Sequence, residues 1–251
     1  MISQSELKRI RALHLKKVRD DEGRFLVQGR KVVAELLASG LRTEVVFATD
    51  EAAEWVRGRF GRNLPVEVGA PHQLERIGTL ERGNELVAVA FSPPAVTFRA
   101  PGAGELMLAL DDIHDPRNMG GLLRIADWFG IRRLLCSPDC IEVHNPKVVQ
   151  SSMGSVFRVE VRHASLVDEL RACAASGAHV YLATMDGPDV YDVELARPAV
   201  LVMGSESHGL SDAMRALHAG IVSIPRFGGA ESLNVAMAAA ALCTEFARRA
   251  R

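Results

Sequence analysis

The sequence contains few cysteines, no CxxC pair and no apolar segment long enough to cross a membrane. Its four cysteines, Cys136, Cys140, Cys173 and Cys243, form no paired framework, which argues against a disulfide-bonded secreted domain. Cys136 and Cys140 could share a metal with His144, but no second ligand cluster accompanies them, so we expect no metal. The N-terminal stretch MISQSELKRIRALHLKK lacks the apolar core of a signal peptide. We therefore expect a cytoplasmic protein without a membrane partner.

The common nucleotide-binding motifs are also missing. The chain has neither GxGxxG nor P-loop spacing, and it shows no internal repeat or low-complexity tract. A nucleotide-dependent enzyme of the Rossmann type is therefore a weak alternative. Hydrophobic content of 48% and charged content of 24% are those of an ordinary globular protein, and 251 residues allow one or two domains.

Positive charge is concentrated at the N-terminal end, although the net charge of the whole chain is -1. Residues 1–31 carry nine Lys or Arg against four acids. Clustered cations favour a polyanionic partner whose phosphates they neutralise. A solvated helix face explains the same pattern without any partner.

The first ninety residues alternate between helical and strand patterns. Leu7, Ile10 and Leu13 recur at helical spacing among basic residues, which predicts a basic amphipathic helix that extends to about residue 18. Strands are predicted at 25–28, 43–49, 65–69 and 85–91, and helices at 31–38, 51–59 and 71–78. This pattern indicates a small α/β domain over residues 1–91. Prolines and glycines without periodicity predict a linker over residues 92–104.

The second half, residues 105–251, also alternates. Apolar strands are predicted at 106–110, 132–136, 156–161, 178–184, 199–204 and 220–225. Helices are expected at about 122–129, after the turn with the two glycines, and at about 147–153, 166–175, near Asp212 and from about 233 to 249. Apolar strands with intervening helices predict a mostly parallel sheet that is covered on both faces.

The segment DDIHDPRNMGGLLRIADWFG, residues 111–130, follows a strand predicted to be buried. Asp115-Pro116 interrupts regular structure, and two adjacent glycines allow a close approach of the backbone. The apolar face of the helix that follows leaves Arg124 pointing elsewhere, six residues after Asn118. The segment by itself is equally compatible with an ordinary strand-to-helix turn.

Two further predicted strands end in loops of a similar kind, GSESHGLS and RFGGAESLN. Both combine glycines, such as Gly204, with side chains that can orient a ligand, such as Glu206, Ser232 and Asn234. Ligands of parallel sheets bind beyond the carboxyl ends of the strands. Each loop could merely cap a helix, but the three together favour a shared site.

These residues carry a strong resemblance. DDIHDPRNMGGLLRIADWFGI, LVMGSESHGLS and IPRFGGAESLNVAMAAA resemble, in order and spacing, the three motifs of the SpoU (TrmH-like) RNA ribose 2'-O-methyltransferases of the SPOUT superfamily. NPKVVQSSMGSVFRVEV is similar to the segment between the first two motifs. The resemblance covers about residues 105–251. LKKVRDDEGRFLVQGRKVVAELL more loosely resembles the N-terminal substrate-binding domain of this family.

The resemblance implies an α/β fold whose C-terminal parallel sheet contains a deep trefoil knot, beside a smaller N-terminal substrate-binding domain. It implies transfer of a methyl group from S-adenosylmethionine to a ribose 2'-hydroxyl of structured RNA, with rRNA of the 23S type favoured over tRNA. A homodimer is implied as well. Alternatives are a tRNA 2'-O-methyltransferase, a knotted enzyme that methylates a base, and an RNA-binding protein without catalysis.

The resemblance also assigns roles to residues. The catalytic residues would be Asn118, Arg124, Glu206, Ser232 and Asn234. The cofactor would be held near Thr184, Gly204, Ile224 and Leu233. With RNA as the partner, the best candidates for phosphate contacts are Lys16, Lys17, Arg19, Arg30 and Lys31.

The chain departs from the family pattern at three positions. Arg226 stands where methionine is usual, Ala236 where serine is frequent and Glu160 where proline is common. None belongs to the expected catalytic set, so these departures leave the expected activity in place. Arg226 is expected to alter the rim where RNA enters.

Overall fold

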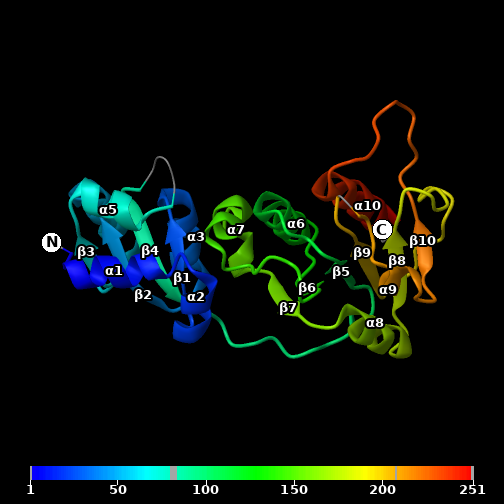
Figure 1. The fold of residues 1–251 in the computed structure, drawn as a ribbon, viewed down its shortest axis with the longest axis horizontal. Coiled ribbons are helices and arrows are strands. Elements are labelled where there is room, and N and C mark those ends of the chain that lie inside the picture. Colours follow the sequence, from blue (N-terminus) through cyan, green and yellow to red (C-terminus); the bar gives the residue numbers. More distant parts are fainter. Residues whose placement is uncertain (1, 80–83, 207, 250–251) are drawn as a thin grey trace. The chain divides into compact units, whose positions relative to one another are not determined.

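A computed structural model describes residues 2–79, 84–206 and 208–249, and Figure 1 traces its elements along the chain. The chain divides into two units. The first unit contains Met1–Pro94 together with Glu142–Arg158, and the second contains Ala95–Ile141 and Val159–Arg251. The segment Glu142–Arg158, which lies inside the predicted second domain, thus clusters with the N-terminal residues. The predicted domain limits, 1–91, 92–104 and 105–251, stay a prediction.

The first unit is built on a four-stranded sheet in the order β1-β4-β2-β3. Its strands are β1 (Arg24–Gln28), β2 (Thr43–Ala48), β3 (Val66–Val68) and β4 (Leu86–Phe91). Strand β4 is antiparallel to β1 and β2, and β3 is parallel to β2. Its helices are α1 (Gln4–Ala12), α2 (Lys16–Glu22), α3 (Arg30–Ser39), α4 (Asp50–Phe60), α5 (Pro71–Ile77) and α7 (Pro146–Ser152).

Helices α1 and α5 lie side by side on one face of this sheet (Figure 1). Their apolar residues Leu7, Ile10 and Leu74 share a buried cluster with Leu26 and Phe47 of the strands. The predicted basic helix to residue 18 is divided into α1 and α2. The chain turns between them at His14, whose Nε2 lies 2.9 Å from the carbonyl oxygen of Ile77. A tertiary hydrogen bond at this turn therefore accompanies the break in the helical pattern.

The second unit contains a six-stranded, wholly parallel sheet in the order β10-β8-β9-β5-β6-β7. Its strands are β5 (Leu106–Leu110), β6 (Arg133–Cys136), β7 (Glu160–His163), β8 (His179–Ala183), β9 (Ala199–Met203) and β10 (Gly220–Val222). The central strands β5 and β9 are buried at every position. The predicted parallel sheet is confirmed, while the trefoil knot stays a prediction.

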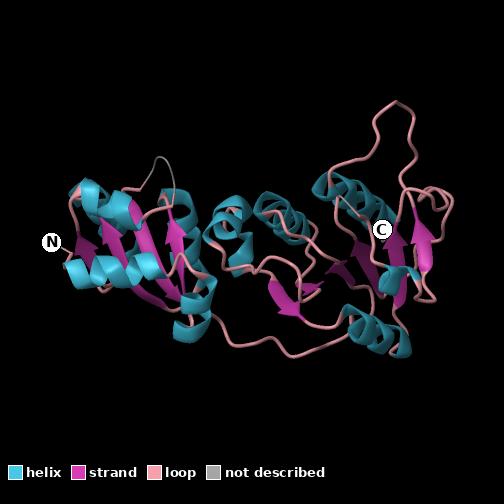
Figure 2. Ribbon diagram, in the orientation of Figure 1, coloured by secondary structure: helices cyan, strands magenta, loops and turns pink. Residues whose placement is uncertain are grey.

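Helices cover both faces of the parallel sheet (Figure 2). On one face, α8 (Leu166–Ala175) and α9 (Asp212–Arg215) contribute Leu170 and Met214 to a buried cluster with the strands. On the other face, α6 (Pro116–Trp128) packs against α10 (Val235–Arg249). A Cβ added to Gly121 would lie 3.1 Å from the Cβ of Ala236, so two small residues allow the helices to approach closely. Within the described ranges, no helix is long and apolar enough to cross a membrane.

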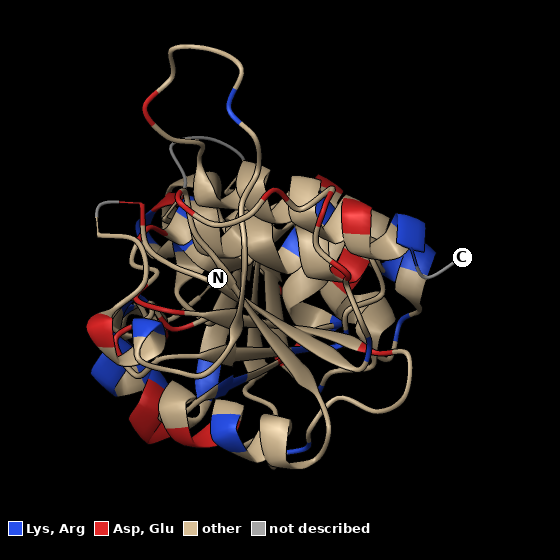
Figure 3. Cartoon of the chain, turned by 90° about the vertical axis from the view of Figure 1, so that its right-hand side faces the viewer, with Lys and Arg blue, Asp and Glu red and all other residues tan. Residues whose placement is uncertain are grey.

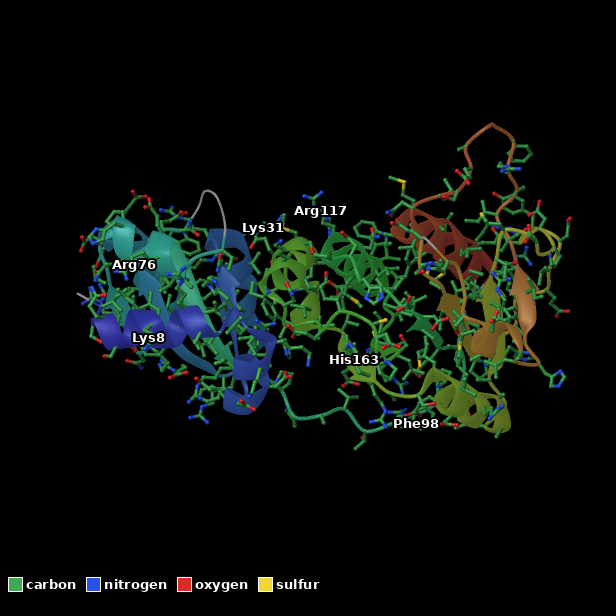
Figure 4. All side chains as sticks on the ribbon, in the orientation of Figure 1. Lys8, Lys31, Arg76, Phe98, Arg117 and His163 are labelled. Carbon is green, nitrogen blue, oxygen red and sulfur yellow. The ribbon has the colours of Figure 1, made fainter. Side chains whose placement is uncertain are left out.

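Residues 95–104, most of the predicted linker, form neither helix nor strand but are held on the second unit. Nη1 of Arg162 donates to the carbonyl oxygen of Val96 at 2.9 Å. Phe98 and Ala100 pack against the buried cluster under α8, where Figure 4 labels Phe98. Arg133 donates to the carbonyl oxygen of Arg99 at 2.7 Å. These contacts make the segment part of the second unit rather than a free tether.

The predicted strand over residues 156–161 is wrong in its first half. The chain forms a 3-10 turn over Ser155–Phe157, and the strand begins only at Glu160. Gly154 has a φ of 97°, a left-handed conformation that glycine adopts readily and that starts the turn. The Phe157 ring then lies 6.4 Å from that of Phe25 within the first unit. Val156 is buried and Phe157 half-buried in this turn, by tertiary packing and not by a strand.

Candidate functional site

Three loops meet at the carboxyl edge of the parallel sheet. They follow β5, β9 and β10, and the register of the strands brings their ends to one side. Leu110 pairs with Met203, and the backbone amide of Asp111 continues the ladder by donating to the carbonyl oxygen of Met203 at 2.9 Å. In Figure 3 the loop between β10 and α10 extends away from the sheet. The expected meeting of the three loops is therefore present in the fold.

Three of the five predicted catalytic residues form one hydrogen-bonded group. The side-chain nitrogen of Asn234 donates to Oδ1 of Asn118 at 2.9 Å and also to Oε1 of Glu206 in a short contact. Oε1 of Glu206 accepts a further hydrogen bond from the amide of Val235 at 3.3 Å. Each of the three motifs thus contributes one member, although the residues are 28 to 116 positions apart.

Asn234 also caps α10. Its Oδ1 accepts from the backbone amides of Ala236 at 3.0 Å and Met237 at 3.3 Å. The amide group therefore uses both of its donors on the site and its acceptor on the helix. A flipped amide would point its oxygen at two other oxygens, so the network fixes one orientation. Helix α10 and the candidate site are in this way positioned by the same side chain.

Ligand-facing groups remain on this network. Among the residues that the structure describes, the side-chain nitrogen of Asn118 and Oε2 of Glu206 have no hydrogen-bond partner. Arg124, on α6, is exposed and has no side-chain partner within the same described ranges. The site thus offers an amide donor, a carboxylate oxygen and a guanidinium. Ser232 lies in the exposed loop before α10, and within the described ranges its side chain forms no hydrogen bond with the other four.

The loop around Asn118 is held by aspartates of the first motif. Their roles were not predicted from the sequence. Oδ2 of the buried Asp111 accepts from the amide of Ser211 at 2.7 Å, which ties the loop after β5 to the loop after β9. Oδ1 of Asp115 caps α6 by accepting from the amide of Asn118 at 3.0 Å. Asp112 has a φ of 62° and lies 2.7 Å from Nε2 of His114. The repeated aspartates of DDIHDP are the sequence signal that could have indicated these roles.

The predicted cofactor residues follow β8, β9 and β10 at the same edge. The amide of Thr184 donates to the carbonyl oxygen of Val222 at 3.0 Å, so Thr184 and Ile224 lie at neighbouring strand ends. Leu233 is 51% exposed in the loop before α10. A Cβ on Gly204 would lie 2.3 Å from the carbonyl carbon of Gly209, because the loop after β9 folds back on itself. Gly204 is therefore needed for this turn whatever ligand is bound.

One buried group fits a polar ligand at this edge. The Oγ1 atom of Thr184 is buried and has no hydrogen-bond partner among the described residues. A buried hydroxyl without a partner costs about 1–3 kcal/mol, so a ligand that hydrogen-bonds to it gains that difference. S-adenosylmethionine carries polar adenosine and methionine groups that can supply such a partner. The residues present at this edge therefore fit the cofactor that the resemblance implies.

The predicted phosphate contacts differ in how available they are. Arg19 is only 3% exposed, donates to the carbonyl oxygen of Leu13 at 2.7 Å and forms a salt bridge with Glu142. This corrects the prediction for Arg19, because a buried, paired guanidinium holds the fold and cannot reach a phosphate. Arg30 forms ion pairs with Glu51 at 2.7 Å and Glu85 at 3.7 Å.

The lysines are more available than the two arginines. Lys16 is paired with Asp20 at 2.7 Å but remains exposed. Lys17 and Lys31 are exposed and have no side-chain partner within the described part of the chain. Figure 4 shows Lys31 at the surface of the first unit. These two lysines are therefore the strongest remaining candidates for phosphate contacts.

Cys136 and Cys140 contribute to packing beside the first motif. The buried Sγ of Cys140 accepts from the amide of Ile113 at 3.2 Å and donates to the carbonyl oxygen of Leu110 at 3.2 Å. A hydrogen bond from Cys136 holds the pKa of the Cys140 thiol at about 6, below its usual range, despite burial. His144 stacks on Phe25 at 4.3 Å. Within the described ranges, no group of three or more His, Cys, Asp or Glu is arranged to hold a metal ion.

Comparison with known protein families gives two matches along the chain. Residues 105–244 match the model of the SpoU rRNA methylase family. Residues 4–88 match the MRM3-like substrate binding domain. The first match contains all five predicted catalytic residues and all four predicted cofactor residues, and the second contains the candidate phosphate contacts.

Individual relatives are similar over nearly the whole chain. The chain is 33% identical over 239 residues to a 23S rRNA (uridine(2479)-2'-O)-methyltransferase of Streptomyces viridochromogenes, which covers 90% of this chain and 83% of that protein. It is 28% identical over 234 residues to the 23S rRNA (guanosine(2553)-2'-O)-methyltransferase RlmP of Bacillus subtilis, covering 92% and 91%. The crystal structure of the SpoU methyltransferase AviRb from S. viridochromogenes with its cofactor AdoMet superposes with a TM-score of 0.87, at 28% identity and 98% coverage of each chain.

Proposed function

Because this chain belongs to the SpoU rRNA methylase family, we propose that it transfers a methyl group from S-adenosylmethionine to a ribose 2'-hydroxyl of rRNA of the 23S type. The observation that carries the proposal is the hydrogen-bonded group of Asn118, Glu206 and Asn234, which assembles all three family motifs at one edge of the sheet. S-adenosylmethionine, when bound, supplies a methyl group on a positively charged sulfur. In the transfer the ribose oxygen would gain the bond to the methyl carbon, the sulfur would keep the electron pair of the broken bond, and the hydroxyl proton would leave to solvent. The side chains of the site must then bind the RNA ribose, orient its hydroxyl and stabilise charge on that oxygen.

Arg124 is suited to stabilise negative charge on the ribose oxygen. A guanidinium is always protonated in proteins, so Arg124 donates hydrogen bonds to the ribose oxygen rather than removing its proton. Donors aimed at an oxygen that gains negative charge lower the barrier of the reaction. The exposed position of Arg124 on α6, without a partner among the described residues, leaves its donors free for this purpose. Asn118 and Glu206, held by Asn234, fix the geometry in which the hydroxyl is approached.

The proposed activity is tested with the purified chain, S-adenosylmethionine carrying a labelled methyl group, and 23S rRNA from cells that lack the gene. We expect label in the RNA and, after digestion to nucleosides, 2'-O-methylribose at one position. Label found on a base, or in tRNA alone, would contradict the proposal. Binding of S-adenosylmethionine and RNA without any incorporation would instead support a protein that binds RNA without methylating it.

The favoured substrate is rRNA because the resemblance to 23S rRNA enzymes extends over the N-terminal domain. The relatives from S. viridochromogenes and B. subtilis match 90% and 92% of this chain, so both the catalytic and the substrate-binding parts are included. These two relatives act on different nucleotides, a uridine and a guanosine. The methylated nucleotide therefore does not carry over to this chain. A ribosomal substrate also implies a cytoplasmic location.

Lys17 and Lys31 are proposed to contact RNA phosphates through the N-terminal domain. We expect the double variant Lys17→Ala/Lys31→Ala to bind rRNA more weakly and to lower the slope of log affinity against log salt by about 1.4 to 1.8, since each phosphate contact releases counterions. Fluorescence anisotropy at several salt concentrations measures both quantities. Arg62→Ala, which removes another exposed cation of the same domain, is the control. An unchanged slope in the double variant would remove both lysines from the interface.

A homodimer is proposed from the family and from two exposed apolar side chains. Trp128 on α6 is 84% exposed and Met237 on α10 is 67% exposed, and these two helices pack against each other. A second copy of the chain would bury both side chains next to the site. Sedimentation of the purified chain as a monomer at micromolar concentration would contradict this proposal.

A further inference from the structure

A cavity of about 330 Å³ lies in the second unit, away from the loops that hold Asn118 and Asn234. Its lining comes from the residues that precede β5, β6 and β9 and from the first residues of β5 and β6. The lining residues are Pro101, Gly104, Glu105, Leu106, Met107, Phe129, Gly130, Ile131, Arg132, Arg133 and Arg197. The cavity thus opens at the amino edge of the sheet. Strand β5 has five residues, and at about 3.3 Å per residue it separates the two edges by roughly 15 Å.

Three guanidinium groups line this cavity against one carboxylate. The carboxylate of Glu105 already has hydrogen-bond partners inside the protein. Its Oε2 accepts from the amide of Gly102 at 2.8 Å and from Nη2 of Arg133 at 2.5 Å. These contacts, with Arg99 and Arg132 nearby, also hold the pKa of Glu105 below its usual range. Among the residues that line it, the cavity therefore has an excess of positive charge.

The three arginines differ in how many donors remain free. Arg133 is largely committed to the fold, because it donates to Glu105 and to the carbonyl oxygens of Arg99 at 2.7 Å and Ala100 at 3.4 Å. Arg197 donates through Nη1 to the carbonyl oxygen of Gly104 at 2.8 Å. The Arg132 side chain forms no hydrogen bond or ion pair within the described part of the chain. A guanidinium has five N–H donors, so Arg132 and Arg197 keep most of theirs available at the cavity.

A simple packing gap does not account for these features. The apolar lining residues Leu106, Met107 and Ile131 are at most 8% exposed, so they close the floor of the cavity. Of the charged lining residues, Arg132 is exposed and Arg197 is half-buried. A volume of about 300 Å³ is at the lower end of small-ligand sites. The cavity is therefore a basic, walled site of ligand size.

We propose that this cavity binds a phosphate group, which Arg132 and Arg197 hold by charge-assisted hydrogen bonds while the ion pair of Arg133 with Glu105 forms a fixed wall beside it. Arginine binds phosphate oxygens through paired N–H groups, and the donor supply here matches that geometry. The phosphate is either a phosphodiester of the RNA substrate or a free phosphate monoester. Both present charged non-bridging oxygens, two in a diester and three in a monoester, and both would bind without occupying the carboxyl edge where Asn118, Glu206 and Asn234 meet.

Isothermal titration calorimetry of the full-length chain at low salt tests the proposal with three probes: inorganic phosphate, adenosine 5'-monophosphate and a short single-stranded RNA. We expect saturable binding of at least one probe and a loss of affinity of at least about tenfold in Arg132→Ala/Arg197→Ala, since two charged donors are removed. Arg171→Ala, which removes an exposed arginine on α8, is the matched control and should bind like the wild type. Loss for RNA alone assigns the site to the substrate, and loss for the two small probes assigns it to a free phosphate.

The single variant Arg132→Ala separates a loss of phosphate binding from a loss of folding. The Arg132 side chain forms no hydrogen bond among the described residues, so its removal should not destabilise the fold. The variant should melt like the wild type and still weaken the affected probe. S-adenosylmethionine affinity, measured in parallel, should be unchanged in every variant, which separates this site from the proposed methyl-transfer site. Unaltered binding of all three probes by the double variant, or no binding of any probe to the wild type, would overturn the proposal.

Discussion

The variant Arg124→Ala is expected to incorporate methyl groups into rRNA about 10²- to 10³-fold more slowly than the wild type under saturating cofactor and RNA. This factor is typical for the loss of one donor that stabilises a developing oxyanion. Arg124 is exposed on α6 and has no partner within the described ranges, so its removal should leave the free energy of unfolding nearly unchanged. Single-turnover methylation and a thermal melt measure the two effects separately.

Two further variants make this test specific. Arg124→Lys keeps the positive charge but loses the planar pair of donors, so we expect it to recover only a small part of the rate. Arg171→Ala removes an exposed arginine of the same unit and should methylate at the wild-type rate. Near wild-type turnover in Arg124→Ala would remove Arg124 from the mechanism. Equal loss of S-adenosylmethionine affinity would show that it acts through the cofactor site instead.

Substitution of Asn234 is expected to have the second large effect on methyl transfer, because the oxygen and the nitrogen of its side-chain amide make different contacts. Its Oδ1 caps α10, and its side-chain nitrogen joins Asn118 to Glu206. Asn234→Ala removes both tasks, and we expect a rate at least about 10²-fold lower together with a loss of about 1 kcal/mol of stability from the missing cap. Asn234→Asp keeps an oxygen for the cap but places a carboxylate against Glu206.

The aspartate variant separates the two tasks. We expect Asn234→Asp to be closer to the wild type in stability than Asn234→Ala, since a carboxylate at a helix N-terminus is favourable. Its methylation rate should nevertheless fall about as far as that of the alanine variant. Ser3→Ala, which removes the cap of α1 at Glu6, is the matched control and should lower stability without lowering the rate of methyl transfer at saturating RNA. An aspartate variant that is unstable yet fully active would refute the division of roles.

Local patterns predicted most of the fold. The alternation of apolar strands with amphipathic helices indicated the parallel sheet, since burial on both faces demands continuous apolar runs such as Leu106–Leu110. The prediction of strands failed where the local residue composition favours a strand but tertiary packing favours another structure. Val156 and Phe157 have strand-like composition, but they pack in the first unit after the left-handed turn at Gly154.

Three residues of the candidate site, Asn118, Glu206 and Asn234, were named from the sequence, but their mutual contacts were not predicted. Glycines with polar residues after three strands pointed to Glu206 and Asn234, because such loops are uncommon in a chain of ordinary composition. The double role of Asn234 was not predictable, since capping and bridging depend on distances between loops. Asp111 was missed for the same reason: its partner, the amide of Ser211, is 100 residues away in the sequence.

By itself the sequence determined the kinds of elements, the order of the three motifs and the candidate site residues, because these depend on periodicity, residue type and the resemblance of the motifs. Only the tertiary structure decided which charges are free to act. Arg19 and Lys17 belong to the same basic segment, yet Arg19 is buried against Glu142 and Lys17 faces solvent. The register of the parallel strands likewise brought Asn118, Glu206 and Asn234 within hydrogen-bonding distance and gathered Arg132 with Arg197 at the opposite edge. Side chains distant in sequence become neighbours only through the packing of the sheet, and packing is a property of the whole chain.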